Sequence, residues 1–416
     1  MISELVGGIL VGGVLVQLGF ISVENVRRVV GRHRQEDLDL EILKTQLAMV
    51  RDLWRKRADG ALPWNGYRKF LVSRKVMECC DICSFYLTPH DKKPLPDFLP
   101  GQYLTFRINI AGSGSPVIRC YTISDAPHSD NYRITIKRIP ARDDRGPPGM
   151  ASAFFHDQIQ EGDILDVKAP AGQFYLDPAG RLPVVLIGSG IGVTPVLSML
   201  STLITQGSRR EVWFFHGVRN RAEHIMREHL ETIARENPYV RLNVCCSQPE
   251  PDYKLGEDYH HEGRISINLL KKLLPSSNFD FYICGPGSMM QDIIEGLKEW
   301  GVPDINIHYE TFGPSSVKKV AAAAAQGSAA PVAFAVHFKR SGKTVSWSDE
   351  HGSLLELAEA HGVNIPCGCR AGSCGTCQVA VFSGDIALVA KSDVETNPGT
   401  HLTCIGAPKS DLVLDA

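Results

Sequence analysis

The sequence has no excess of charge of either sign, and it has few cysteines for its length. Its 416 residues include 44 Lys and Arg against 46 Asp and Glu, which gives a formal net charge of -2. This balance offers no electrostatic argument for a nucleic-acid partner. Twelve cysteines are too few for a disulfide scaffold, which favours a reducing compartment. The sequence also lacks a Ser-His-Asp order and an HExxH motif, so hydrolysis has no support.

Long apolar runs are scarce as well, with one exception near the start. The segment from Leu5 to Val23 carries no charged side chain and, at about 1.5 Å per residue, is long enough to cross a bilayer. Arginines follow it between residues 27 and 34, so the positive-inside rule places the rest of the chain in the cytoplasm. We therefore expect a transmembrane helix in 1–24 that anchors the protein in a membrane, with cytoplasmic catalytic domains. A buried or surface-lying helix is the alternative.

The rest of the chain divides into segments that differ in their pattern of apolar and polar residues. Apolar residues at three- and four-residue intervals predict a helical stalk in 25–62. Short alternating runs bounded by Gly, Pro and Asp predict an antiparallel β-barrel in 63–180. Apolar strands that alternate with helical stretches predict an α/β domain with a doubly wound parallel sheet in 181–313. An Ala-rich linker in 314–331 then leads to a last domain in 332–416.

The strongest motif lies in this last domain and has the spacing CxxxxCxxC followed by a distant cysteine. Its residues are Cys369, Cys374, Cys377 and Cys404. Four thiolates suit a cluster of two irons, because each iron takes two sulfur ligands from the protein. The run from Pro366 to Cys377 resembles the ligand loop of plant-type ferredoxins, which implies a 2Fe-2S cluster in an α+β domain of the β-grasp type. A structural zinc site is the alternative, although zinc sites favour paired CxxC motifs. We take Cys367 as a non-ligand.

A candidate flavin motif lies in the barrel, in the run Arg119-Cys-Tyr-Thr-Ile-Ser124. A cation, an aromatic ring and a hydroxyl are what a flavin needs for its phosphate, its ring face and its reactive nitrogen. An ordinary amphipathic strand is the alternative. The run resembles the RxY(S/T) motif of the ferredoxin-NADP reductase superfamily, which implies that Arg119 binds flavin phosphate, Tyr121 packs on the isoalloxazine and Thr122 lies near N5. Ser124 closes the motif as a further candidate flavin contact.

A second flavin segment precedes an expected helix in the barrel domain. Gly149, Ala151 and Ser152 place small residues where a pyrophosphate can approach a helix N-terminus. The segment resembles the GxxS motif of the same superfamily. The sequence around it is most similar to the reductase half of flavohaemoglobins, which use FAD, and this similarity favours FAD over FMN.

A glycine-rich loop joins an expected strand to an expected helix, in the run Gly188-Ser-Gly-Ile-Gly-Val-Thr-Pro195. Backbone amides in such a loop can approach phosphates. We expect Thr194 to be the N-cap of the helix and Pro195 its first residue. The loop is not the GxGxxG fingerprint, but it resembles the GxGxGxTP loop of the superfamily. The resemblance implies that the nicotinamide coenzyme binds at Gly188, Gly190, Gly192, Thr194 and Pro195.

Two later segments complete the resemblance. The run from Cys284 to Met289 resembles the CGPxxM motif of the superfamily, which implies that Cys284 lies near the nicotinamide; a buried structural cysteine is the alternative. The run from Tyr309 to Gly313 resembles its terminal segment, which implies that Glu310 and Phe312 lie over the flavin. The coenzyme residues expected from the first run are Cys284, Gly285, Pro286 and Met289. The expected catalytic residues are Thr122, Cys284 and Glu310.

These motifs in the order of the superfamily imply an NAD(P)H-dependent ferredoxin-type oxidoreductase. Hydride would pass from NADH or NADPH to FAD, and single electrons would leave through the 2Fe-2S cluster. Oxygenase reductases share this domain order, which implies an acceptor protein such as a Rieske or di-iron oxygenase, a hydroxylase or a desaturase. Two alternatives remain: a reductase for a hybrid-cluster or haem protein in nitrogen-oxide stress, and a non-catalytic redox-sensing module. Arg219 and Arg221 follow the second strand of the coenzyme domain, and they leave the choice between NADH and NADPH open.

Overall fold

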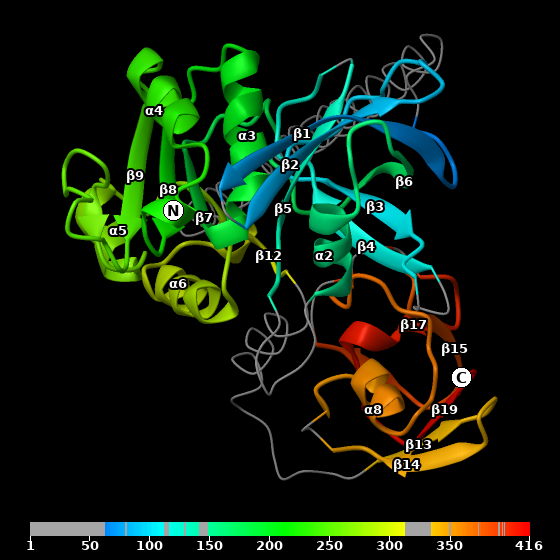
Figure 1. Cartoon of the computed structure of the whole chain (residues 1–416). Coiled ribbons are helices and arrows are strands. Elements are labelled where there is room, and N and C mark those ends of the chain that lie inside the picture. The colour runs from blue at the N-terminus through cyan, green and yellow to red at the C-terminus, as the bar shows by residue number, and fades with distance from the viewer. Residues whose placement is uncertain are drawn as a thin grey trace, which may run out of the picture. The chain divides into compact units, whose positions relative to one another are not determined.

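The computed structural model describes most residues from Pro63 onward. They are 63–79, 81–111, 116–128, 130–140, 149–312, 334–348, 351–372, 374–389, 392, 394 and 396–416. Residues 63–416 form one compact unit, and Figure 1 shows its helices and strands. The predicted stalk in 25–62 and the predicted linker in 314–331 lie outside the described residues.

The first domain is a sheet of six strands in the order β4-β3-β6-β1-β2-β5. Its elements are β1 (Arg68–Cys79), β2 (Ile82–Pro89), β3 (Tyr103–Ile108), β4 (Val117–Thr122), β5 (Tyr132–Lys137), α2 (Met150–Asp157) and β6 (Ile164–Ala171). Neighbouring strands all pair antiparallel. A bridge between Ile123 and Ile134 joins the two edge strands, so the sheet closes into a barrel.

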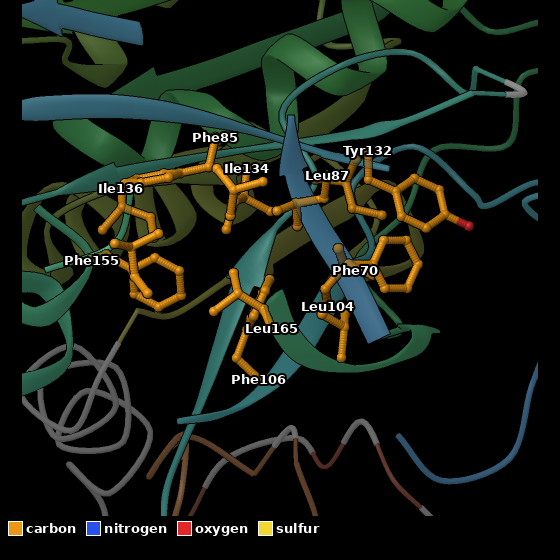
Figure 2. Close-up of a cluster of buried hydrophobic side chains, with 14 of the residues drawn as sticks. Phe70, Phe85, Leu87, Leu104, Phe106, Tyr132, Ile134, Ile136, Phe155 and Leu165 are labelled. Atoms are coloured by element: carbon orange, nitrogen blue, oxygen red, sulfur yellow. The ribbon is translucent and has the colours of Figure 1, made fainter. Parts of the chain in front are cut away.

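Aromatic and branched side chains fill the interior of this barrel, as Figure 2 shows. Phe155 of α2 meets Phe85 and Phe106 edge to face, with ring centroids 5.4 and 5.6 Å apart. The three rings are completely buried, and burial of each such side chain contributes about 1.5–3 kcal/mol. This packing holds α2 against the strands and so fixes the position of its N-terminus.

The second domain is a sheet of six strands, all parallel, in the order β10-β9-β8-β7-β11-β12. Its strands are β7 (Val184–Ser189), β8 (Val212–Val218), β9 (Val240–Cys246), β10 (His261–Glu262), β11 (Asp280–Cys284) and β12 (Ile307–Glu310). The chain runs outward from β7 to β8 and β9, and later returns to place β11 on the other side of β7. This reversal is the point at which open α/β sheets bind ligands, beyond the carboxyl ends of the strands.

Helices cover both faces of the parallel sheet (Figure 1). They are α3 (Val193–Thr205), α4 (Arg227–Glu236), α5 (Ile267–Leu273) and α6 (Gly287–Glu299). Helices α3 and α4 pack with Val184, Leu186 and Phe214 on one face. Helices α5 and α6 pack with the alternate strand residues, such as Val185 and Phe215, on the other. Burial on both faces explains why these strands are continuous apolar runs.

The third domain is a five-stranded sheet in the order β14-β13-β19-β15-β17, with a two-stranded sheet of β16 and β18. Its elements are β13 (Ala335–Phe338), β14 (Lys343–Ser346), α8 (Leu354–Ala360), β15 (Gln378–Ser383), β16 (Ile386–Leu388), β17 (Thr400–Leu402), β18 (Gly406–Pro408) and β19 (Leu412–Leu414). Helix α8 begins at an N-cap, Ser353, whose hydroxyl accepts from the Glu356 N–H. Its Leu354 and Leu357 are completely buried in the core. The described residues 361–372 and 374–377 connect α8 to β15 and include Cys369, Cys374 and Cys377.

The structure corrects the predicted fold class and location, because both included an N-terminal transmembrane helix. Among the described residues, no helix is long and apolar enough to cross a membrane. The longest, α3 and α6, have 13 residues each, whereas a span needs about 20. The predicted span from Leu5 to Val23 itself lies outside the described residues. The corrected fold class is a barrel, a parallel α/β domain and a ferredoxin-like domain, and neither a membrane span nor a membrane-anchored location is retained.

Candidate functional site

A cavity of about 690 Å³ has walls from all three domains. Its size is within the range of about 300–1,000 Å³ typical of cofactor pockets. The lining residues predicted from the sequence are Arg119, Tyr121, Thr122, Gly149, Ala151, Ser152, Thr194, Glu310, Phe312 and Cys369. The structure thus brings most of the predicted flavin residues and one predicted cluster ligand to one space.

Strand β4 supplies the predicted flavin motif to this cavity. Tyr121 packs edge to face on Phe155, with ring centroids 5.2 Å apart, and burial raises the pKa of its hydroxyl above the ordinary value. Thr122 is buried at the end of the strand. The Arg119 Nη1 donates to the carbonyls of Ile118, at 2.7 Å, and Gly368, at 3.1 Å. A cation, a neutral phenol and a hydroxyl therefore meet in the arrangement that suits a flavin.

The start of α2 forms the second predicted flavin segment. Gly149 is the N-cap, and the Ser152 hydroxyl donates to its carbonyl at 2.9 Å. The same hydroxyl accepts from the Ile139 N–H at 3.1 Å. A Cβ at position 149 would lie 2.8 Å from the Ile139 Cβ, so the close approach requires glycine. Ser152 therefore fixes the first turn, whose N–H groups lack intrahelical partners and suit a diphosphate.

The glycine loop after β7 approaches the end of β11 very closely. A Cβ at Gly192 would lie 2.4 Å from the Cys284 carbonyl oxygen, and one at Gly188 would lie 2.7 Å from the Val193 Cα. Gly190 has φ of +55°, and a Cβ added to it would have no atom within 4 Å. Packing thus explains the first and third glycines, and backbone conformation explains the second. Their clearance leaves the carboxyl ends of β7 and β11 accessible to a dinucleotide, which fits the predicted coenzyme site.

The predicted N-cap at Thr194 is wrong. Helix α3 begins at Val193, with Gly192 as its N-cap, and the Thr194 hydroxyl donates to the Ile191 carbonyl at 2.9 Å. Pro195 is accordingly the third helical residue rather than the first. The physical reason is the 3-10 turn Gly190–Gly192, which starts the helical rotation before the hydroxyl and proline signals do.

Cys284 and Glu310 end the adjacent parallel strands β11 and β12 as direct register partners. Cys284 is completely buried, and burial together with the Glu310 carboxylate raises the pKa of its thiol well above the ordinary value. The group is therefore a neutral thiol at pH 7. Cys284 is not among the residues that line the cavity, whereas Glu310 is. The roles of these two residues in hydride transfer remain predictions.

The four predicted cluster ligands lie in two pairs. The N–H groups of Cys369 and Cys374 each donate to the other residue's sulfur at 3.3 Å, and the Cys377 and Cys404 side chains lie within hydrogen-bond reach of each other. Among the described residues, no three His, Cys, Asp or Glu side chains gather as one metal ion requires. Two cysteine pairs fit a centre of two irons better than a single tetrahedral zinc. The Cys367 sulfur faces Glu359 and Arg370 instead.

Some predicted residues do not reach the cavity. The hydroxyl of Ser124 is completely buried in a network with Thr135 and Arg133, so it stabilises the barrel instead. Predicted coenzyme residues that lie outside the cavity lining are Gly188, Gly190, Gly192, Pro195, Cys284, Gly285, Pro286 and Met289. These belong to the carboxyl edge of the parallel sheet, where the coenzyme rather than the flavin is expected.

Other lining residues were missed by the sequence analysis. Lys137 and Arg138, at the end of β5, and Cys120, inside the flavin motif, line the cavity. The Lys137 Nζ pairs with Glu223 at 3.1 Å and Asp81 at 3.3 Å. Burial alone would lower the pKa of Lys137, but the two carboxylates raise it overall. The available signal was the basic end of the alternating run in β5, because β5 is the next strand after the motif strand β4 along the chain.

The two arginines that left the coenzyme choice open are both close to acids. Arg221 lies 3.2 Å from Asp252 and 3.8 Å from Asp258, and its guanidinium stacks over the Tyr253 ring at 5.1 Å. Arg219 lies 3.9 Å from Glu223. Carboxylates near this strand end disfavour binding of the 2'-phosphate of NADPH, because they repel its negative charge.

Comparisons with known proteins agree with this three-domain arrangement. Residues 69–175 match the oxidoreductase FAD-binding domain family, 186–295 the oxidoreductase NAD-binding domain family, and 336–409 the 2Fe-2S iron-sulfur cluster binding domain family. A flavohemoprotein from Halalkalibacterium halodurans is 37% identical over 298 residues, which cover 70% of this chain and 72% of that protein. One from Bordetella pertussis is 38% identical over 304 residues, covering 70% and 74%.

Two solved structures are similar in fold and sequence. The FAD/NAD-binding domain of nitric oxide dioxygenase from Vibrio cholerae is 31% identical with a TM-score of 0.53, covering 60% of this chain and 100% of that one. Phthalate dioxygenase reductase is 26% identical with a TM-score of 0.53, covering 85% and 98%. The predicted cofactors FAD, nicotinamide coenzyme and 2Fe-2S cluster are thereby confirmed. This chain belongs to the ferredoxin-NADP reductase superfamily with a C-terminal 2Fe-2S domain, and it is an NAD(P)H-dependent flavin and iron-sulfur oxidoreductase.

Proposed function

We propose that this chain is the reductase component of an oxygenase system, and that it delivers electrons singly to a Rieske or di-iron oxygenase, hydroxylase or desaturase. One observation carries the proposal: Gly368–Ala371 of the cluster loop line the same cavity as the flavin motif of β4. Bound FAD would supply the acceptor for one hydride, which carries two electrons, and the 2Fe-2S centre would supply a one-electron exit. The similarity to phthalate dioxygenase reductase over 85% of this chain supports an oxygenase as the acceptor.

The protein's own residues have separate tasks in this proposal. Arg119 and the first turn of α2 hold the negatively charged phosphates of FAD, because a guanidinium and helix N–H groups are complementary to them. Tyr121 and Phe312 line the proposed site of the flavin ring, and Thr122 offers a hydroxyl there. The loop Gly188–Gly192 holds the coenzyme at the carboxyl edge of the parallel sheet. Cys369, Cys374, Cys377 and Cys404 hold the cluster.

We also propose NADH as the preferred coenzyme. Glu223, Asp252 and Asp258 lie against the two arginines that a 2'-phosphate would otherwise use. We expect kcat/KM for NADH to exceed that for NADPH by about tenfold or more, the effect of about 1.4 kcal/mol. Steady-state kinetics with ferricyanide as acceptor would measure both values, and equal values would contradict the preference.

Reconstitution tests the proposed acceptor. The purified holoprotein is mixed with NADH and, in separate reactions, with a Rieske oxygenase and a di-iron hydroxylase, and product formed per NADH oxidised is measured. We expect coupled product formation with one of the two classes. The control is ferricyanide reduction, which reports the flavin without a protein acceptor. Active ferricyanide reduction with no oxygenase turnover would contradict the proposal.

A second candidate function is favoured by relatives that are more nearly identical in sequence to this chain than phthalate dioxygenase reductase is. Flavohemoproteins from Bacillus cereus reach 40% identity over 271 residues, more than phthalate dioxygenase reductase does. The alternative acceptor is therefore a separate haem protein. NADH-dependent reduction of a globin haem, followed by its visible spectrum, distinguishes the two, since an oxygenase reductase would reduce that haem slowly compared with its own partner.

A further inference from the structure

Three successive residues of β4 contact the cluster loop. The Arg119 Nη1 donates to the Gly368 carbonyl at 3.1 Å. A Cβ at Gly368 would lie 3.1 Å from the Ile118 Cγ2 and 2.8 Å from the Cys374 Sγ, so the loop fits against the strand because this residue is glycine. Cys120 follows, and its thiol lies within hydrogen-bond reach of the Cys369 and Cys374 side chains. The strand that carries the flavin motif therefore also carries a contact to two predicted cluster ligands.

The surroundings of Cys120 orient its thiol. Cys120 is directly opposite Thr105 in the β3–β4 ladder, and the Thr105 Oγ1 lies 3.4 Å from the Cys120 Sγ. A threonine hydroxyl can donate to a cysteine sulfur, which leaves the S–H free to point toward the cluster loop. Cys120 also lines the flavin cavity, so its thiol lies between the flavin site and the Cys369/Cys374 pair.

This pair already receives hydrogen bonds from its own loop. The Ala371 N–H donates to the Cys369 sulfur at 3.4 Å, and the Cys374 N–H donates to the same sulfur at 3.3 Å. Donors to ligand sulfurs stabilise the extra negative charge of a reduced cluster, and they therefore raise its reduction potential. A donor from the flavin domain adds to this effect when the two domains are in contact.

We propose that Cys120 is a positioning residue that donates its single S–H to the sulfur of Cys369 or of Cys374, and thereby holds the cluster loop against β4 and raises the potential of the cluster. Its partners, Cys369 and Cys374, are two of the four predicted cluster ligands. The donor favours electron flow from the flavin toward the cluster, because a higher cluster potential makes that transfer more favourable. The inference concerns transfer within the chain, so it holds whether the acceptor is an oxygenase or a haem protein.

The test is a redox titration of the holoprotein without any acceptor protein. The cluster potential is followed by electron paramagnetic resonance and the flavin potential by absorbance, in the natural protein, Cys120→Ala and Cys120→Ser. We expect Cys120→Ala to lower the cluster potential. The equilibrium ratio of reduced to oxidised cluster should fall about tenfold at a given solution potential, which is about 59 mV for a one-electron couple. Cys120→Ser keeps a donor and should retain most of the natural potential. The matched control is Cys79→Ala, a cysteine of β1 in the same barrel, and it should leave both potentials unchanged.

Each other outcome overturns the inference. An unchanged cluster potential in Cys120→Ala shows that the thiol donates nothing to the cluster, and an equal shift in Cys120→Ser shows that the size of the side chain matters rather than its donor. Loss of the cluster spectrum in Cys120→Ala shows that Cys120 is itself a ligand. Thr105→Val provides a second measurement that leaves the cysteine in place. It should lower the cluster potential by less than Cys120→Ala does, and a rise would contradict the assigned orientation.

Discussion

The flavin motif of β4 and the glycine loop after β7 serve neighbouring sites by different means. On β4, Arg119, Tyr121 and Thr122 line the cavity with their side chains. In the loop, Gly188 and Gly192 act by having no side chain, because a Cβ would meet backbone atoms at 2.7 and 2.4 Å. Backbone in a packed interior cannot move aside cheaply. Changes on β4 should therefore alter chemistry gradually, whereas changes in the loop should damage the fold.

The cluster loop is a third case, in which side chains are the predicted ligands of the cluster, and a change there should give the largest effect. We expect Cys374→Ala to abolish the cluster's absorbance and to reduce the rate of electron transfer to cytochrome c by more than about 100-fold. Loss of a group that only hydrogen-bonds a metal ligand costs up to about 100-fold, and loss of a ligand should cost more. Ferricyanide reduction should stay near the natural rate, because the flavin cavity keeps its other walls. The matched control is Cys367→Ala, whose sulfur faces Glu359 and Arg370. An intact cluster in Cys374→Ala would refute the ligand assignment.

The glycine loop offers a matched pair that isolates clearance from backbone conformation. Gly192→Ala should lower the free energy of unfolding by about 3 kcal/mol, because its Cβ would overlap the Cys284 carbonyl. Gly190→Ala should cost about 1–2 kcal/mol, since it meets open space and suffers from the left-handed φ of +55° alone. Urea unfolding measures both. Equal losses in the two variants would remove the distinction between clearance and conformation.

Buried histidines extend the comparison to acid stability. His216 on β8 is completely buried, and neither ring nitrogen has a hydrogen-bond partner in the described part of the chain. Burial and nearby His224 lower the pKa of His216 to about 3, and burial lowers that of His224 to about 4. The folded pKa values lie below the unfolded value of about 6.5. The stability that depends on keeping these two histidines neutral is therefore fully present above pH 6.5 and is lost as the pH falls below it.

We expect the free energy of unfolding of the domain with the parallel sheet to fall by about 1.6 kcal/mol per histidine between pH 6.5 and pH 5. His216→Phe should reduce the slope of unfolding free energy against pH in this range, because it removes one group that must be protonated on unfolding. His90→Gln, at an exposed position after β2, is the matched control for replacing a histidine. Measurement of denaturant unfolding at pH 5 and pH 7 decides, and equal slopes in the His216 variant and the natural protein would count against the account.

The smallest expected effect belongs to a single side chain of the flavin motif. Thr122→Val should slow flavin reduction by NADH about fivefold to tenfold, because it removes one hydroxyl while it keeps the shape of the strand end. Thr122→Ser keeps the hydroxyl and should remain within about twofold of the natural rate. Stopped-flow absorbance measures the step, and urea unfolding should show similar stability in both. A slow Thr122→Ser protein would indicate that packing of the methyl group matters more.

The sequence was most informative where a pattern has one physical cause. The CxxxxCxxC spacing is demanded by two irons that share one loop, and the structure brings Cys369 and Cys374 together as that loop requires. Continuous apolar runs such as Val184 to Ile187 in β7 reflect burial on two faces of a parallel sheet. The sequence misled where several causes give one pattern. Apolar length alone predicted a membrane span that no helix in the described residues provides. A hydroxyl before a proline predicted the N-cap at Thr194, two residues after the observed N-cap at Gly192.

The sequence by itself determined the order of the three domains, the cofactor classes and the types of side chain at each motif, because these depend on local spacing and on residue chemistry. The tertiary structure decided which residues face the cavity. It buried Ser124 in the barrel network and brought Cys120 and Arg119 against a loop some 250 positions later in the chain, as the Arg119–Gly368 contact with its separation of 249 residues records. Contacts of that kind arise from packing between domains, and no local pattern in the sequence carries them.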